Sequence, residues 1–283
     1  MQVKDENITT LGPISDNTKT FIRCEVPVPS NNMYYRNFRG HMCLSKDGRS
    51  FKDKMAPYLL YKKQIKGKVS IDLILNWNNK RKRDLDNYFK AIIDSIKNKL
   101  IEDDDSITKL HAVKRCGTTL PPSSPLPKLS GFDLVVESIP STLEGVAQPS
   151  LSNTIAGILQ TSSGTNSCHL VCNLTIPSNN TYYRNFRGHM CLSPKGRQFK
   201  EMMQAYFEGK EQVVGPVCVY LVVNFKDRRI RDLDNYFKAV FDAIKGYLIE
   251  DDDQVVELWA EKNITVGQNN FELLILRAIE GTH

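Results

Sequence analysis

Arg83-Asp84-Leu85-Asp86-Asn87-Tyr88-Phe89-Lys90 opens the stretch that decides the fold, which continues through Asp94 to Glu102-Asp103-Asp104-Asp105. The stretch returns 148 residues later as Arg231-Asp232-Leu233-Asp234-Asn235-Tyr236-Phe237-Lys238, followed by Asp242 and Glu250-Asp251-Asp252-Asp253. The copies agree at 18 of the 23 positions from Arg83 to Asp105, and each holds seven acids. Because closely spaced carboxylates repel unless a cation lies between them, the repeated acids indicate a site for divalent metal.

A second block of sequence that the two copies share precedes each motif. From Asn31 to Met55 the copies agree at 19 of 25 positions, whereas between Ala56 and Lys82 they differ heavily. A strand in the core needs only suitable volume and pattern, so the retained polar residues are the ones that require particular atoms. The duplication predicts two tandem domains of roughly 115 residues, repeat 1 at 21–137 and repeat 2 at 168–279.

The residue pattern predicts four strands and about two helices in each repeat. In repeat 1, Phe89, Ile92, Ile93 and Ile96 form an apolar stripe at helical spacing. The expected elements of repeat 1 are a turn at 29–40, helices at 49–64 and 86–99, and strands at 21–28, 69–77, 107–114 and 132–137. Repeat 2 is expected to follow the same plan.

Three segments are expected to lie outside this plan. Residues 1–20 show no periodicity and are expected to be a flexible tail. Residues 138–167 are rich in Ser, Thr, Gly and Asn, and they carry only one charge, at Glu144. This composition predicts a flexible linker, long enough at about 30 Å r.m.s. for the repeats to pair within one chain. Within it, 155–159 is apolar but is assigned no structure. Nine extra residues of repeat 1, around Pro121 and Pro122, predict a longer surface hairpin.

Composition narrows the class of protein. The net charge of +6 is a mild bias towards anionic partners. Seven cysteines form no CxxC pair, which argues against a zinc ribbon or a disulfide scaffold, and Cys24 and Cys172 are expected to be reduced core residues. The polar start contains Asp5 and Glu6, so we do not expect it to be a signal peptide. No apolar run is long enough to cross a membrane, so we expect a cytoplasmic protein.

Oxygen-only ligands favour Mg²⁺, with Mn²⁺ as a substitute, over zinc. A metal held by the acids, with Lys90 and Arg83 beside it, would suit phosphodiester hydrolysis. The acids could instead be helix caps and a solvated loop, but their repetition beside a divergent core favours the metal site. The basic runs 80–83 and 228–231 are either a solvated face or a track for phosphates. Tyr34, Tyr35 and their counterparts either stack on bases or pack in the core.

The string Pro-Ser-Asn-Asn-x-Tyr-Tyr-Arg, then Arg-Asp-Leu-Asp-Asn-x-x-Lys-x-x-x-Asp, then Asp-Asp-x-Gln-Val in repeat 2, resembles the RusA-type Holliday junction resolvases. The resemblance covers nearly all of both repeats. It implies a small α+β fold, an obligate dimer, and Mg²⁺-dependent paired cuts in four-way DNA junctions, in recombination and repair.

The resemblance also assigns residues. The family's catalytic, metal-binding aspartates fall on Asp84, Asp86 and Asp104, and on Asp232, Asp234 and Asp252. Its essential lysine falls on Lys90 and Lys238, and its basic residue before the first aspartate on Arg83 and Arg231. Asp103 and Asp251 are then flanking acids. The expected DNA-binding residues are basic and tyrosine side chains near the motifs: Arg81, Arg83, Tyr35, Arg36, Arg229, Arg231, Tyr183 and Arg184.

Two departures from the family pattern set the remaining expectations. Family members usually carry one copy and dimerise, so we expect an intrachain pseudo-dimer here, or a homodimer that exchanges repeats. Repeat 1 has Ser106-Ile107 where repeat 2 has Gln254-Val255, which leaves the acids intact. We therefore expect one complete metal site within each repeat. Flaps or three-way branches stay open as substrates. A branched-DNA binding protein with little catalysis and a metal-dependent nucleotide hydrolase stay open as functions.

Overall fold

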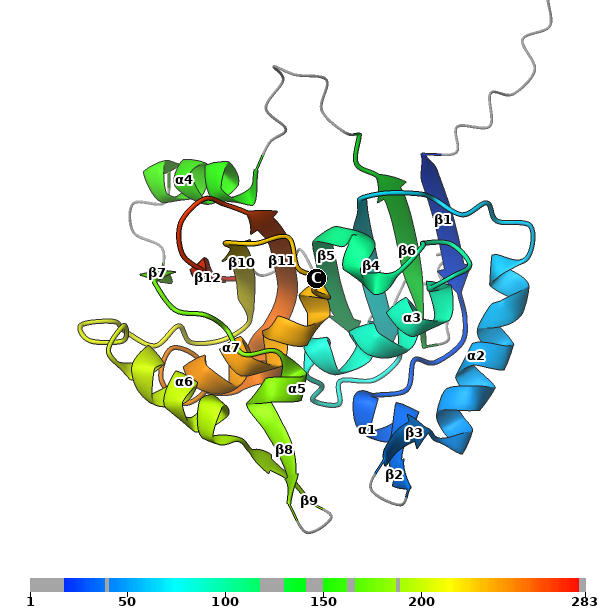
Figure 1. The fold of residues 1–283 in the computed structure, drawn as a ribbon, viewed down its shortest axis with the longest axis horizontal. Helices are drawn as coiled ribbons and strands as arrows, with labels where there is room; N and C mark the ends of the chain where they lie inside the picture. The colour runs from blue at the N-terminus through cyan, green and yellow to red at the C-terminus, as the bar shows by residue number, and fades with distance from the viewer. Residues whose placement is uncertain are drawn as a thin grey trace, which may run out of the picture.

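The computed structural model describes residues 18–38, 41–117, 130–140, 150–161, 166–186 and 189–279. Repeat 1 contains, in chain order, β1 (Lys19–Cys24), α1 (Asn31–Tyr34), β2 (Tyr35–Phe38), β3 (His41–Leu44), α2 (Lys46–Leu59), β4 (Val69–Trp77), η1 (Leu85–Tyr88), α3 (Phe89–Ile96), η2 (Asp104–Ser106), β5 (Ile107–Cys116) and β6 (Gly131–Ser138). Figure 1 shows the same arrangement in the second half of the molecule.

Repeat 2 reproduces this order after one additional helix, α4 (Leu151–Thr161). Its elements are β7 (Ser167–Cys172), α5 (Asn179–Tyr182), β8 (Tyr183–Phe186), β9 (His189–Leu192), α6 (Pro194–Gln204), β10 (Val217–Phe225), η3 (Leu233–Tyr236), α7 (Phe237–Ile244), η4 (Asp252–Gln254), β11 (Val255–Ile264) and β12 (Asn270–Arg277). The α+β architecture of two tandem repeats is thus confirmed.

The motif helix begins later and ends earlier than the sequence predicts. Its first turn is the 3₁₀ segment η1, and regular α-helix runs only from Phe89 to Ile96. The predicted apolar stripe is buried, with Ile96 fully inaccessible. The helix stops there because Asn98 adopts a positive φ of 61°, and its counterpart Gly246 a φ of 78°. A left-handed residue just past the last turn is a common way to end a helix.

A continuous eight-stranded sheet joins the repeats across the described residues, in the order β1-β6-β4-β5-β11-β10-β12-β7. Strand β5 pairs antiparallel with β11, and this pairing is the seam between the repeats. The pairs are exchanged between the repeats: Lys109 lies opposite Glu261, the counterpart of Val113, and Val113 lies opposite Glu257, the counterpart of Lys109. At the centre, His111 lies opposite its own counterpart, Trp259. A pseudo-two-fold axis through the His111–Trp259 pair therefore exchanges β5 and β11, as in an isologous dimer interface.

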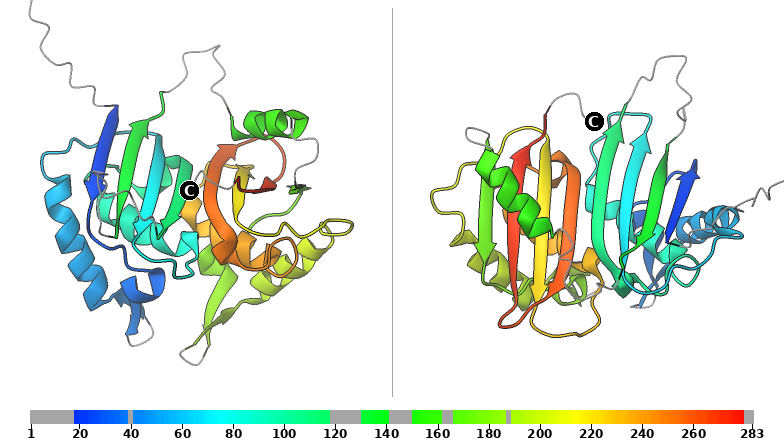
Figure 2. Two further views of the ribbon diagram at one scale, coloured as in Figure 1. Left: turned by 180° about the vertical axis from the view of Figure 1, so that it is seen from behind. Right: turned by 90° about the horizontal axis from the view of Figure 1, so that it is seen from above.

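Side chains alternate between the two faces of the sheet along each strand, and the two faces are covered differently. Helices α2 and α3, and likewise α6 and α7, cover one face of the sheet (Figure 1). On β10, Val219, Leu221 and Val223 pack in that core, whereas Val222 belongs to a separate apolar cluster on the other face. Helix α4 lies across this other face, over the strands of repeat 2, as the view from above in Figure 2 shows.

Helix α4 corrects the expectation that 138–167 carries no structure. Ile155 is fully buried, and Leu151 is 8% exposed, in a cluster with Val222 and Leu274. The backbone N–H of Leu151 donates to Glu261 Oε2 at 2.7 Å, so an acid caps the helix start. The composition of the segment did not show this, because only a few apolar side chains anchor the helix.

Other boundaries also differ from the prediction. The expected turn at 29–40 holds the short helix α1 and the first strand of the hairpin β2–β3. Helix α2 starts at Lys46 because Ser45 Oγ accepts the N–H of Gly48, and it includes Pro57 near its end. The strand predicted at 69–77 is confirmed. Most of the tail (1–17) and the insertion around Pro121 lie outside the described residues.

His111 links the two repeats on the face of the sheet away from α3. Its Nδ1 lies 3.1 Å from Asp72 Oδ1 in repeat 1, and its Nε2 lies 3.0 Å from Glu257 Oε1 in repeat 2. Its ring stacks on Trp259 at 3.6 Å. Burial opposes protonation of the imidazole, but the hydrogen bonds to Asp72 and Glu257 more than offset this and raise the pKa of His111.

We predict a pH-dependent contribution of His111 to stability. A raised folded-state pKa stabilises below the unfolded pKa of about 6.5, and this stabilisation is lost as pH rises through the folded-state pKa. Chemical denaturation from about pH 6 to about pH 9 should show a fall in unfolding free energy that His111→Gln reduces. Equal pH profiles for the wild-type chain and the variant would contradict this role.

Candidate metal centres between the repeats

Each motif begins with an aspartate held by its own turn. Asp84 is the extended residue before η1, and Asn87 Nδ2 donates to its Oδ2 at 3.0 Å. The same bond in repeat 2 joins Asn235 to Asp232 at 2.9 Å. Two positions later, Asp86 is only 8% exposed. The asparagine that both repeats share thus has a structural role, because it holds the carboxylate that leads into the motif helix.

The third aspartate of each repeat starts a short 3₁₀ turn before the seam strand. Asp104 and Asp252 are 5% and 2% exposed. The backbone N–H of Asp104 donates to Asp103 Oδ1 at 2.7 Å. This turn leads directly into β5, so the pairing of β5 with β11 controls where Asp104 lies.

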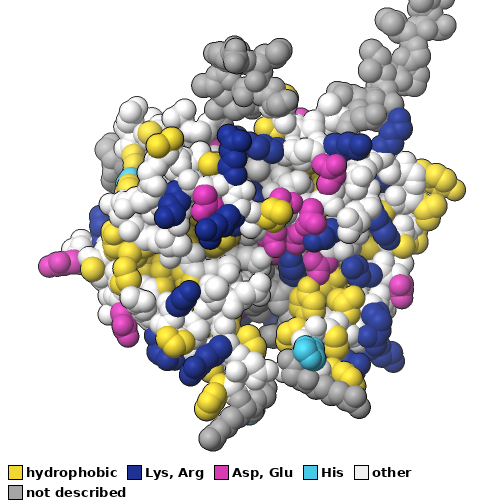
Figure 3. Space-filling view, in the orientation of Figure 1, with side chains coloured by type: hydrophobic (Ala, Val, Ile, Leu, Met, Phe, Trp, Pro, Cys, Tyr) yellow, Lys and Arg dark blue, Asp and Glu magenta, His cyan; other side chains and the backbone are white. Residues whose placement is uncertain are grey.

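The acids group across the repeats. Cluster A consists of Asp84 from repeat 1 with Asp251 and Asp252 from repeat 2, and cluster B consists of Asp232 from repeat 2 with Asp103 and Asp104 from repeat 1. In each cluster, one carboxylate oxygen per residue lies within 4.8 Å of the others. Figure 3 shows acidic side chains gathered near the middle of this face, with lysine and arginine side chains around them.

The expectation that each repeat completes its own site does not match this grouping, because each cluster takes carboxylates from both repeats. The charged groups that act most strongly on Asp84 are Asp252, Lys238, Asp251 and Lys245, which all belong to repeat 2. The reason is topological, because the seam places the acid turn of one repeat against the motif of the other. Asp103 and Asp251, expected to be flanking acids, are members of the clusters.

The lysines assigned from the motif contact the same acids. Lys90 Nζ lies 2.8 Å from Asp104 Oδ2, 3.4 Å from Asp94 Oδ1, and 3.9 Å from Asp234 Oδ2 of the other repeat. Lys238 Nζ repeats the pattern at 2.8 Å from Asp252 Oδ2. Each lysine therefore stands between an acid of its own repeat and the motif of the other.

Two further lysines were missed by the sequence reasoning. Lys97 Nζ lies 2.6 Å from Asp103 Oδ1 and 2.8 Å from Asp104 Oδ1. Its counterpart Lys245 lies 2.8 Å from Asp251 Oδ1 and 3.0 Å from Asp252 Oδ1. The sequence signal that could have identified them is that lysine occupies this position in both repeats. The contacts with Asp103 and Asp104 raise the pKa of Lys97, so it remains a cation.

The carboxylates of each centre titrate differently. Burial raises the pKa of Asp86 to about 7 and that of Asp234 to about 6. Burial also opposes ionisation of Asp104, but hydrogen bonds involving Asp103, Lys90 and Lys97 more than offset it and hold the pKa of Asp104 well below its usual range. Asp104 therefore stays ionised at lower pH than Asp86, which binds a proton near neutral pH.

The residues fit a hard divalent cation. Both clusters offer carboxylate oxygens alone, the ligand type that such ions prefer. Asp86 Oδ1 is buried and makes no hydrogen bond to any described residue. A buried carboxylate oxygen without a partner is costly, and a nearby cation would remove that cost.

The expected DNA-binding arginines lie at different distances from the clusters. Arg83 and Arg231 directly precede Asp84 and Asp232, and their guanidinium carbons lie 4.9 Å and 4.4 Å from the ring centroids of Trp77 and Phe225. Arg81 and Arg229 are exposed just upstream. Arg36 and Arg184 are exposed on the hairpins β2–β3 and β8–β9, which project from the body (Figure 1).

The tyrosines are half-buried. The Tyr35 ring packs edge-on against Tyr34, with centroids 4.8 Å apart, and its hydroxyl donates to Asp94. Tyr183 repeats this contact, donating to Asp242 Oδ2 at 2.7 Å. Each tyrosine thus connects a hairpin to a motif helix, which favours packing over base stacking for these rings. A direct role in DNA binding stays a prediction.

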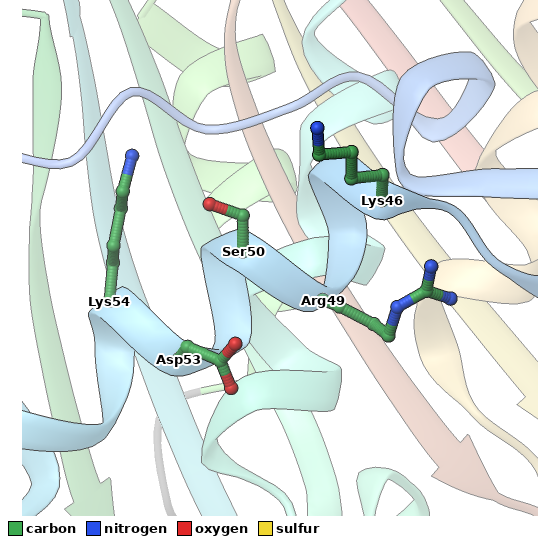
Figure 4. A pocket seen from close by; sticks show the side chains of 5 residues that line it. All are labelled: Lys46, Arg49, Ser50, Asp53 and Lys54. Carbon is green, nitrogen blue, oxygen red and sulfur yellow. The ribbon is translucent and has the colours of Figure 1, made fainter.

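A depression elsewhere on the surface does not belong to the centres. It is lined by Lys46, Arg49, Ser50, Asp53 and Lys54, and Figure 4 shows that all of these side chains come from helix α2. None of the clustered carboxylates lines it. Across the described residues, moreover, there is no helix with the length and apolar character needed to span a bilayer.

Comparison with known proteins places these features in a family. The sequence model of the family described as Endodeoxyribonuclease RusA matches residues 25–122 and 174–272. A crossover junction endodeoxyribonuclease from Enterobacteria phage 82 is 37% identical over 103 residues, which cover 35% of this chain and 86% of the relative. Proteins of the same name from Shigella sonnei and Escherichia coli are 36% identical over the same length and shares.

We predict that divalent metal stabilises the protein more at about pH 8 than at about pH 5. The folded-state pKa values of Asp86 and Asp234 lie above the ordinary 3.8. Protons thus favour the folded state at low pH, and that contribution is lost as pH rises through about 7. A metal competes for the same carboxylates only when they are ionised. Thermal unfolding with and without Mg²⁺ at both pH values measures the increment.

The matched control is the double variant Asp86→Asn with Asp234→Asn. It should reduce the difference between the two pH values, because the titrating carboxylates are gone. A metal-dependent increment that is the same at both pH values in the wild-type chain would contradict this assignment.

Proposed function

The chain belongs to the RusA family of endodeoxyribonucleases, and from this premise we propose that it is a Mg²⁺-dependent endonuclease that resolves four-way DNA junctions by paired cuts. Its role would lie in DNA recombination and repair. The proposal includes two active centres in one chain, formed between repeats that span about 21–137 and 168–279. A second chain would then not be needed.

One observation supports this proposal above the others: the two carboxylate clusters are equivalent and are built across a pseudo-two-fold seam. A four-way junction offers two equivalent phosphodiester bonds related by a two-fold axis. Two equivalent centres fixed to one rigid sheet suit such a substrate, because both bonds can be held at once. A small nucleotide does not offer a pair of bonds related by a two-fold axis.

Cluster A illustrates the proposed chemistry. Asp84, Asp251 and Asp252 would hold the metal, with Asp86 beside them. A Mg²⁺ ion held there would polarise a phosphate oxygen and lower the pKa of a coordinated water. Lys238 contributes an ammonium group 2.8 Å from Asp252 Oδ2, where it can offset negative charge that develops on the phosphate. The acids around it raise its pKa, so it stays protonated.

The surrounding cations would orient the DNA. Arg83 and Arg231 are the basic residues nearest in sequence to the clusters, and their guanidinium groups lie over the rings of Trp77 and Phe225. The exposed Arg81, Arg229, Arg36 and Arg184 are available for phosphates further along the arms. Such contacts position the backbone without reading sequence.

Cleavage of a synthetic four-way junction tests the proposed function. With Mg²⁺ the purified chain should cut two strands symmetrically near the branch point, and with EDTA it should cut neither. Linear duplex of the same sequence is the control and should stay intact. Tight junction binding without cuts would overturn the proposal in favour of a binding protein, and flap cleavage without junction cleavage would change the substrate.

The composite grouping gives a sharper prediction. Asp84→Asn with Asp252→Asn removes two acids of cluster A and leaves cluster B intact. Asp84→Asn with Asp104→Asn removes one acid from each cluster. On a supercoiled plasmid with an extruded cruciform, the first double variant should produce nicked circles. The second should lose nicking by at least about 100-fold, a typical loss for a displaced metal-site group.

Complete sites within each repeat would reverse these results, since Asp84 and Asp104 both belong to repeat 1. Nicking by the variant with Asp84 and Asp104 changed, together with an inactive variant at Asp84 and Asp252, would therefore contradict the composite centres.

A further inference from the structure

Two lysines on the seam strands are absent from the centres described above. Lys114 lies on β5 and Lys262 at the equivalent place on β11, 148 residues later. Lys114 is 7% exposed, and Lys262 is partly buried. A lysine is seldom buried without a reason, because its ammonium group loses hydration.

The contacts of Lys114 supply such a reason. Its Nζ donates to the backbone carbonyl of Arg83 at 2.9 Å and to the backbone carbonyl of Asp253. Arg83 immediately precedes Asp84, and Asp253 immediately follows Asp252. One ammonium group therefore joins the two chain segments, one from each repeat, that supply the acids of cluster A.

Lys262 makes the mirror-image connection. Its Nζ donates to the carbonyl of Asp105 at 2.5 Å and to the carbonyl of Arg231. Asp105 follows Asp104, and Arg231 precedes Asp232, so this lysine joins the two segments of cluster B. Neither lysine contacts the acids of the other cluster through these bonds.

The choice of lysine suits this task. An ammonium group carries three donors on one compact atom, so it can bind two carbonyls that belong to different segments. Its charge also lies close to the acids, since Asp253 and Asp84 are among its electrostatic neighbours. Groups that orient metal ligands from outside the ligand set commonly affect metal affinity by about 10- to 100-fold.

We propose that Lys114 and Lys262 are positioning residues for the metal centres, each assigned to one cluster: Lys114 sets Asp84 against Asp252, and Lys262 sets Asp232 against Asp104. The proposal rests on the function proposed above. If the lysines only stabilised the fold, both centres would depend on both of them. The proposal instead requires that each lysine affects one centre and not the other.

The test uses chains with a single working centre. Asp232→Asn leaves only cluster A, and Asp84→Asn leaves only cluster B. In the first background, Lys114→Met should lower nicking of a cruciform plasmid by about 10- to 100-fold, whereas Lys262→Met should lower it by at most about threefold. In the second background the order should reverse. Methionine keeps the length and volume of the side chain without the ammonium group.

A second readout does not depend on DNA cleavage. Mn²⁺ affinity of the single-centre chains, measured by electron paramagnetic resonance, should show the same crossed pattern. If the wild-type chain binds Mn²⁺ but cuts no junction, the proposed function fails while the role of the lysines can still be judged. Lys114→Gln and Lys262→Gln replace the methionine variants if those do not fold; glutamine is neutral and one atom shorter than lysine, so it cannot bridge both carbonyls and should give the same crossed pattern.

Two results would overturn the proposal. Equal losses in both backgrounds would show that the lysines act only through stability of the seam. The absence of any loss in nicking and in Mn²⁺ affinity would show that the carbonyl contacts do not set the acids.

Discussion

The antiparallel pairing of β5 with β11 is the interaction on which the rest of the structure depends. It extends two small sheets into one and creates the pseudo-two-fold axis at the His111–Trp259 pair. It also brings the acid turn at the start of each seam strand against the motif of the other repeat. Neither repeat alone contains all the carboxylates of one cluster, so each cluster forms only when the two repeats pair.

This arrangement gives the duplication a physical meaning. In a dimer of single copies, a composite centre forms only when two chains associate, and its population depends on concentration. Here a linker ties the halves together, so association becomes intramolecular, with an effective concentration set by linker length. The duplication also permits each centre to be altered separately, which identical subunits do not allow.

The two faces of the sheet differ in how closely the repeats match. On the helical face the motifs, lysines and tyrosine contacts are repeated. On the other face, α4 covers Val222 and Leu274 of repeat 2, while the corresponding strand of repeat 1 carries Asp72 near its middle. The duplicated units thus differ on the face away from the carboxylate clusters.

Much of this could be predicted from sequence. The alternation of 69–77 and the stripe from Phe89 to Ile96 gave the main strand and helix, because these patterns are local. The acids and Lys90 were recognised by spacing and repetition. The grouping of Asp84 with Asp252 could not be predicted. Aligning the two repeats shows which residues are equivalent, but it does not show that an acid of one repeat lies against the motif of the other. Helix α4 was missed for a similar reason, since Ile155 becomes a core residue only against Val222.

Counting bound Mn²⁺ ions tests the composite centres most directly. Titrations followed by electron paramagnetic resonance would compare the wild-type chain with two double variants, Asp84→Asn with Asp252→Asn and Asp84→Asn with Asp104→Asn. We expect two tightly bound ions for the wild-type chain, one for the first variant and none for the second. One ion in the second variant and none in the first would show that each repeat holds its own metal, and would contradict the account.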